Sequence, residues 1–178
     1  YIYRGDYFEN HKILVLIGFL MYLIVFFSWI IVSYQLPVYI IPIAIFSILL
    51  TVLLDTTVAL ISSTILILLI SLLIGNDLDF AIIQFFISFI SILSVRKLRK
   101  RRQIIATMLT LVFCSLFVFF SVMLFKGIDF LDYNYSTVGY LALASFLCPI
   151  LAFGLVPLFE SFFGITTDLS LIELLDYD

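Results

Sequence analysis

Long apolar stretches without a charged residue alternate with short polar segments along the chain. The first such stretch covers residues 13–54. At about 1.5 Å per residue, it is roughly twice as long as one helix needs to cross a hydrocarbon core of about 30 Å. The turn signal Gln35-Leu36-Pro37 divides the stretch. The pattern therefore predicts two membrane spans, at about residues 13–34 and 38–54, with Pro42 tolerated near the start of the second.

Four further spans are predicted from the later apolar stretches. Asp55-Thr56-Thr57 supplies N-cap chemistry for a third span, which ends near residue 74 at the polar turn Gly75-Asn76-Asp77. The fourth, fifth and sixth spans cover about residues 80–95, 103–125 and 138–159. The fourth is short, so Arg96 and Lys97 must reach toward the headgroups or the bilayer must thin locally. The predicted fold is an all-α, polytopic transmembrane helix bundle with six spans.

The positions of lysine and arginine predict the orientation of these spans. Cytoplasmic loops retain Lys and Arg, whereas acidic residues have little influence. A cytoplasmic N-terminus keeps eight of the nine basic residues inside, namely Arg4, Lys12 and six in segment 96–102, and leaves only Lys126 outside. With an even number of spans, both termini are cytoplasmic. Residues 1–12 then form a cytoplasmic loop, and residues 13–159 form the transmembrane domain.

Composition supports a membrane protein and excludes several functions. Hydrophobic residues make up 65% of the chain and charged residues 12%, against roughly 45–50% and about 25% in soluble domains. The net charge of −3 offers no general basic surface for nucleic acid. His11 is the single histidine, which excludes a multi-histidine metal site in this chain. Cys114 and Cys148 lie deep in apolar stretches and are interpreted as buried small hydrophobic residues.

Polar residues inside the spans are uncharged and recur at helical spacing. Gln84, Ser88 and Ser91 share one face of the fourth span, and Ala142, Ser145, Pro149 and Ala152 share one face of the sixth. Small and hydroxylated residues let helices approach closely and form interhelical hydrogen bonds. We therefore interpret both faces as packing surfaces rather than as a ligand groove. Because the predicted spans contain no Asp, Glu, Lys, Arg or His, ion-coupled transport is disfavoured.

Residues at the membrane boundaries have simple structural interpretations. The basic segment 96–102 is a topology anchor that contacts anionic headgroups, although the same charge suits a cyclic nucleotide. The acidic and tyrosine residues of the predicted outer loops are too scattered for a calcium site and are interpreted as solvated. They are Asp77, Asp79, Asp129, Asp132, Tyr133 and Tyr135. Four aromatic residues of the first two spans fit the outer membrane interface and do not indicate a ligand site. They are Tyr22, Trp29, Tyr34 and Tyr39.

The C-terminal part of the chain predicts a bent span followed by a helix that leaves the membrane. Pro149, Gly154 and Pro157 crowd the inner half of the sixth span, where missing backbone donors bend a helix. Residues 163–168 predict a break followed by a cap. Ser170, with Glu173 three residues later, has capping-box spacing ahead of an apolar helix face. We therefore predict a cytoplasmic connector helix within residues 160–178.

Residues 155–176 resemble the junction between the membrane and cytosolic parts of PgpH-type seven-transmembrane HD-domain phosphohydrolases. The matching pattern pairs a Pro-Leu-x-Glu helix end at residues 157–160 with Phe-Gly-Ile-Thr-Thr at residues 163–167 and a leucine-rich exit helix. The resemblance implies an extracellular sensor domain, seven transmembrane helices and a cytosolic HD domain that hydrolyses cyclic di-AMP to pApA. The predicted spans then correspond to the second to the seventh helix, in the membrane of a bacterial cell.

The same resemblance implies where the chemistry lies. The HD domain uses a divalent metal pair, manganese or iron, and such a pair needs several His and Asp ligands. This chain has one histidine and no His-Asp dipeptide. We therefore expect no catalytic, metal-binding or cofactor-binding residue in it, and we expect it to be inert alone.

The expected function is that of a membrane anchor and signal-transducing domain of a cyclic-dinucleotide phosphodiesterase. The expected partners are the lipid bilayer and the sensor and HD domains of the same polypeptide, and a homo-oligomer is compatible with the pattern. Signal coupling is assigned to residues around the end of the last span: Pro157, Glu160, Gly164, Thr166, Thr167 and Asp168. The alternative is the six-helix substrate-binding subunit of a vitamin-type transporter, which requires a polar pocket between helices.

Overall fold

The computed structural model describes residues 11–96, 102–127 and 135–163, and all regular secondary structure in these ranges is helical. The elements are α2 (His11–Ser33), the 3-10 turn η1 (Val38–Ile40), α3 (Ile43–Leu53), α4 (Thr56–Ile74), α5 (Leu78–Val95), α6 (Arg102–Phe125) and α7 (Tyr135–Phe163). Five of these helices are long and apolar enough to cross a membrane, and Val38–Leu53 is a shorter apolar segment. The predicted all-α, polytopic bundle is confirmed.

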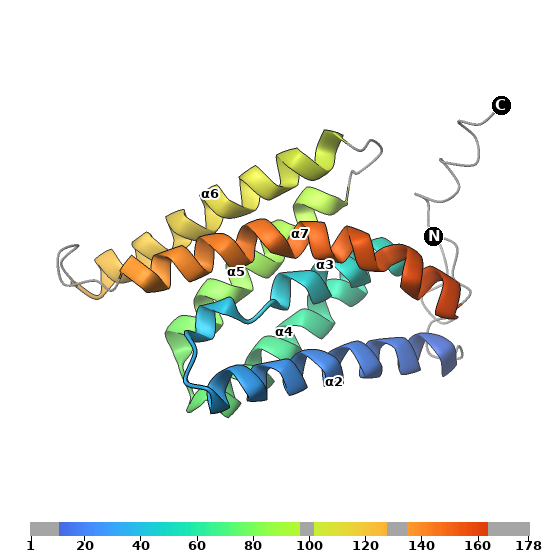
Figure 1. The fold of residues 1–178 in the computed structure, drawn as a ribbon, viewed down its shortest axis with the longest axis horizontal. Coiled ribbons are helices and arrows are strands. Elements are labelled where there is room, and N and C mark those ends of the chain that lie inside the picture. Colours follow the sequence, from blue (N-terminus) through green and yellow to red (C-terminus); the bar gives the residue numbers. More distant parts are fainter. Residues whose placement is uncertain (1–10, 97–101, 128–134, 164–178) are drawn as a thin grey trace.

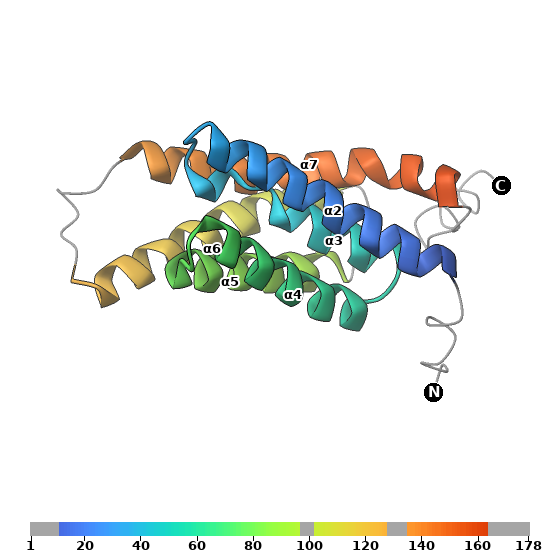
Figure 2. The ribbon, with the colours of Figure 1, turned by 90° about the horizontal axis from the view of Figure 1, so that it is seen from below.

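Helix α3 lies at the centre of the bundle. It contacts α2, α4, α5 and α7, and the two views agree that the longer helices surround it (Figures 1 and 2). Helix α2 begins and α7 ends at the same end of the bundle, where α5 also ends and α6 begins (Figure 1). This arrangement matches an even number of crossings. The opposite end, where α2 ends and α7 begins, is the one that the charge pattern predicts to be outside.

Local capping signals set the ends of α4 and α5. The backbone N–H of Thr57 donates to Asp55 Oδ2 at 3.3 Å, which confirms the predicted N-cap of α4. The N–H of Phe80 donates to Asp77 Oδ1 at 3.1 Å, so α5 begins at Leu78, earlier than predicted. Gly75 ends α4 with a φ of 107°, a left-handed conformation that glycine adopts without steric cost.

The second predicted span differs from the expectation, because Pro42 interrupts it. Residues Val38–Ile40 form a single 3-10 turn, in which the N–H of Ile41 donates to the carbonyl oxygen of Val38 at 3.1 Å. Pro42 has no N–H, and its ring would clash with the carbonyl of residue 38 in a continuous helix. Helix α3 therefore starts only at Ile43 and has 11 residues, a length of about 16 Å.

Burial separates α3 from the helices around it. Every residue from Ile43 to Leu50 is buried, so no side of this part of α3 faces outward. By contrast, α2 and α6 each leave large apolar side chains exposed, as expected for surfaces in contact with lipid acyl chains. The core of the bundle thus forms around the short, interrupted segment.

Helix α7 is the longest element of the described part and contains two prolines. It runs from Tyr135 to Phe163 with Pro149 and Pro157 inside it, and so extends beyond the predicted span at both ends. Figure 1 shows α7 following an arc over the bundle, in line with the predicted bending by proline. Residues 164–178 of the predicted connector helix lie outside the described residues.

Candidate functional site

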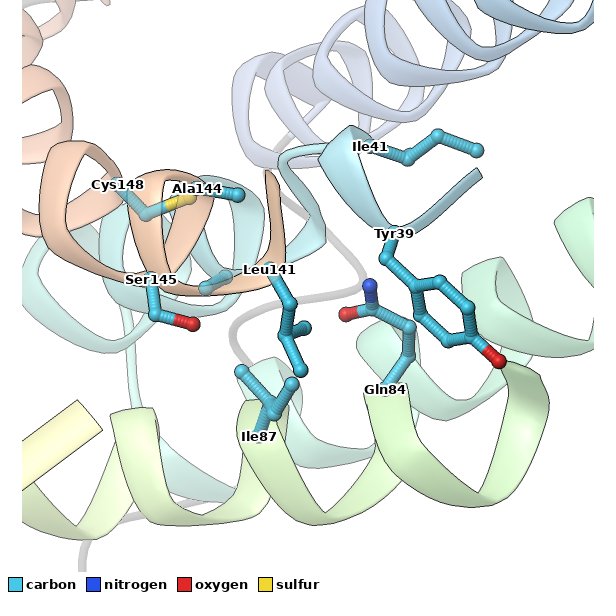
Figure 3. Close-up of a pocket in the computed structure, with 9 residues that line it drawn as sticks. Tyr39, Ile41, Gln84, Ile87, Leu141, Ala144, Ser145 and Cys148 are labelled. Atoms are coloured by element: carbon cyan, nitrogen blue, oxygen red, sulfur yellow. The ribbon is translucent and has the colours of Figure 1, made fainter. Parts of the chain in front are cut away.

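The interruption at Pro42 leaves a small cavity inside the bundle (Figure 3). Its volume is about 10 Å³, and its walls come from the η1 segment, α3, α5 and α7. Four of its lining residues carry polar side-chain groups: Tyr39, Gln84, Ser145 and Cys148. The other described lining residues are apolar, and none of those described is charged. The cavity therefore favours hydrogen bonding with an uncharged group.

Gln84 is the residue that gives this cavity its polar character. It lies in α5, is 3% exposed, and its amide points toward the space between Leu141 and the segment that carries Tyr39 (Figure 3). Within the described part of the chain, no residue forms a hydrogen bond with this amide. All fully sealed side-chain nitrogen and oxygen atoms there do have partners, so the Gln84 amide must face open space. The cavity is that space.

Tyr39 corrects the interface assignment made from sequence. Its side chain is buried, and its ring lies 5.6 Å from that of Phe119 in α6 and 6.1 Å from that of Phe80 in α5. The 3-10 turn between Pro37 and Pro42 places this residue against the core instead of at the surface. The other three aromatic residues of the predicted interface group are exposed, as expected: Tyr22, Trp29 and Tyr34.

The two polar faces predicted to pack helices do so, with one exception. Ser88 of α5 forms a hydrogen bond with Ser47 of α3, and Ser91 donates to the carbonyl oxygen of Ile87 at 2.7 Å. On α7, the predicted packing residues are buried or half-buried: Ala142, Ser145, Pro149 and Ala152. Gln84 shares the face of Ser88 and Ser91 but turns its amide to the cavity, which makes it the candidate for binding.

The residues assigned to signal coupling are only partly within the described structure. Pro157 is exposed and Glu160 is half-buried, both near the C-terminal end of α7. Gly164, Thr166, Thr167 and Asp168 lie outside the described residues. Pro157 and Glu160 therefore lie in the last turns of α7. Figure 1 shows this end of α7 at the same end of the bundle as the start of α2.

The acidic residues at the predicted outer end have structural roles where they are described. Asp77 caps α5, and Asp79 forms an ion pair with Lys126 at the end of α6. Asp129, Asp132 and Tyr133 lie outside the described residues, while Tyr135 is exposed at the start of α7. The described ranges contain no group of three His, Cys, Asp or Glu side chains that could hold a metal ion. The carboxylates of Asp77 and Asp79 thus form intramolecular contacts.

The two cysteines differ in their surroundings. Cys148 is buried in α7 and lines the cavity, whereas Cys114 in α6 is half-buried. The interpretation as a buried small hydrophobic residue is confirmed for Cys148 and only in part for Cys114. Sequence reasoning missed the contribution of Cys148 to the cavity, since nothing in the local pattern shows that α7 passes the Pro42 interruption. In the sequence, Pro37 and Pro42 on either side of Tyr39 indicate that the helix is interrupted at this point.

Comparison with known proteins gives one family match. Residues 1–167 match the family described as a 7TM receptor with intracellular HD hydrolase. Neither a curated protein nor a solved structure matches the chain. The matched range includes the whole described bundle, the cavity and the end of α7. The chain therefore belongs to the family of seven-transmembrane receptors with an intracellular HD hydrolase.

Proposed function

We propose that this chain is the membrane domain of a cyclic-dinucleotide phosphodiesterase, which anchors the enzyme and passes an outer signal to its HD domain. The observation that carries the proposal is the family match over residues 1–167, on a bundle of membrane-spanning helices. The resemblance of residues 155–176 to the PgpH-type junction supports the finer assignment of cyclic di-AMP as substrate and pApA as product.

Helix α7 is the element best placed to carry such a signal. It contacts η1, α3 and α6, and its buried residues Leu141 and Cys148 line the cavity. The same helix continues past Pro157 to Phe163 at the other end of the bundle. A ligand can shift a receptor only by binding two conformations with different affinity. Helix α7 contains prolines and runs from the cavity to its C-terminal end at Phe163, so it is an element able to adopt two such conformations.

The hydrolytic chemistry belongs to the HD domain in this proposal. A pair of divalent metal ions, manganese or iron, would supply the activated water and stabilise the charge that develops on the phosphate. The contribution of this chain is mechanical: it holds the catalytic domain at the membrane and sets its arrangement through α7. The proposed coupling residues are Pro157, Glu160, Gly164, Thr166, Thr167 and Asp168.

A vitamin carrier is the alternative, and the cavity at Gln84 is too small to be its binding site. Sites for small molecules of drug or vitamin size are usually about 300–1,000 Å³. The cavity at Gln84 has a volume of about 10 Å³, enough for roughly one water molecule. Stoichiometric binding of a vitamin to the bundle would favour the carrier.

The test is manganese-dependent hydrolysis of cyclic di-AMP by the full native polypeptide in lipid nanodiscs. We expect activity that a chelator removes, and we expect Pro157→Ala to change the rate or its response to the outer signal. Leu158→Ala is the matched control, because Leu158 is the next residue of α7 and its side chain is exposed. Absence of hydrolysis would contradict the substrate, and a Pro157→Ala enzyme identical to wild type would contradict transmission through α7.

A further inference from the structure

The cavity beside Pro42 has one feature that packing alone does not require, the buried amide of Gln84 in its lining. The cavity is partly open and lies next to the start of α3. Ala44 lines the cavity in the first turn of α3, and no side chain caps that turn. Two N–H groups of that turn already have backbone partners, since Ile43 donates to the carbonyl oxygen of Ile41 at 2.9 Å and Ile45 to that of Pro42 at 3.1 Å.

Gln84 is costly at this position unless something binds it. A glutamine amide offers two donors and an acceptor oxygen, and burying them without partners is unfavourable. Leucine or methionine would fill the same part of α5 without this cost. The neighbouring polar residues of the same face have partners: Ser88 bonds Ser47, and Ser91 bonds the Ile87 carbonyl. The amide of Gln84 instead faces the cavity, which indicates a bound group that the polypeptide does not supply.

The chemistry of that group follows from the lining. None of the described lining residues is charged, so an ion in the cavity would lack a counter-charge among them. The Gln84 amide both donates and accepts, and the Ser145 hydroxyl from α7 lines the same space (Figure 3). The volume of about 10 Å³ suits one oxygen atom with its hydrogens. A neutral hydroxyl oxygen satisfies each condition.

The geometry points to a binding site for one neutral hydroxyl group, held by the Gln84 amide between α5, α7 and the η1 segment. Two sources share this chemistry: a resident water molecule, or the hydroxyl group of a small neutral ligand whose remainder lies outside the cavity. The site goes beyond the proposed phosphodiesterase function and does not depend on it. In either case the bound group bridges α5, α7 and the η1 segment.

The test compares three forms of the full polypeptide in nanodiscs: wild type, Gln84→Met and Ser91→Ala. Methionine keeps the length of the side chain and removes its donors and acceptor. Ser91→Ala is the matched control, since Ser91 is buried on the same face of α5 but bonds its own helix. Each form is examined by high-resolution cryo-electron microscopy, by thermal unfolding, and by mass spectrometry of small molecules released on denaturation.

We expect density for an oxygen within hydrogen-bond distance of the Gln84 amide in wild type and in Ser91→Ala. Gln84→Met should lose this density and melt several degrees lower than wild type. Isolated density with no released compound identifies the group as water, whereas stoichiometric release of a neutral hydroxyl compound, lost in Gln84→Met, identifies a ligand. An empty wild-type cavity, or a Gln84→Met protein that melts at the same or a higher temperature, overturns the assignment. None of these measurements depends on hydrolysis of cyclic di-AMP. A negative result for the hydroxyl site is therefore distinguishable from a failure of the proposed function.

Discussion

Helices α3 and α6 are similar in sequence character and opposite in environment. Both are apolar and free of charge along their interior, yet Ile43 to Leu50 of α3 are all buried, while α6 leaves Phe113 73% exposed. Apolar composition therefore does not distinguish a helix that faces lipid from one that the protein encloses. In a bilayer, both environments are apolar, and the hydrophobic effect alone does not sort side chains between them.

The backbone explains which helix is enclosed. Helix α6 is long enough to satisfy its own hydrogen bonds across the membrane, so lipid can surround it. Helix α3 has 11 residues and follows an interruption at Pro42, where local turn hydrogen bonds replace the regular α-helical pattern. Non-helical backbone is tolerated at membrane depth only when protein or a polar cavity surrounds it. The interruption thus determines both the central position of α3 and the existence of the cavity.

The largest effect in this comparison is expected from removing an aromatic ring. Phe46→Ala in α3 should lower the free energy of unfolding by about 3–5 kcal/mol, because it leaves a cavity in the centre of the bundle. Phe113→Ala in α6 should cost under about 1 kcal/mol, since its ring faces outward. Reversible SDS unfolding in mixed micelles, followed by circular dichroism, measures both. Equal losses would mean that α6 packs against another protein surface.

A smaller effect is expected from two serines in the same pair of helices. Ser47→Ala removes the hydrogen bond to Ser88 that joins α3 to α5 and should cost about 0.6–1.7 kcal/mol, as for other interhelical bonds in membranes. Ser121→Ala in α6 removes only a bond to the Phe117 carbonyl of its own helix and should have a smaller effect. The same unfolding assay compares them. A neutral Ser47→Ala would show that this bond does not hold α3 in place.

The smallest effect is expected at the exposed end of α6. Asp79→Asn breaks the ion pair with Lys126 and should change the free energy of unfolding by less than about 1 kcal/mol, because exposed pairs are weak. The difference from wild type should shrink as salt concentration rises. Unfolding at low and high ionic strength measures this. A large, salt-independent loss would show that this pair holds α6 to the bundle more strongly than its exposure suggests.

Sequence reasoning succeeded where the signal is local. Asp55 precedes two threonines at the start of an apolar stretch, and it caps α4 as predicted. The small and hydroxylated face of α5 was predicted to pack helices, and Ser88 does so. Reasoning failed where the outcome depends on residues distant in sequence. Tyr39 was assigned to the interface because its segment is near a span boundary, but its ring contacts Phe80 and Phe119.

Gln84 illustrates the same limit within one helix. Its spacing from Ser88 and Ser91 predicted a shared, buried face, and the structure confirms that burial. Spacing does not reveal that α7 and the η1 segment leave a space opposite its amide. Whether such a residue packs against a neighbour or lines a binding site depends on which segments of the fold lie opposite its side chain.

The sequence by itself determined the all-helical membrane fold, the ends of α4 and the placement of charges at the two ends of the bundle. These properties follow from hydrophobic length, local capping and the cost of placing charge in hydrocarbon, none of which needs a partner helix. Only the tertiary structure decided that α3 is central, that Tyr39 is buried and that Gln84 faces a cavity. In lipid these outcomes depend on close packing between distant segments, and on where an interrupted backbone can be shielded.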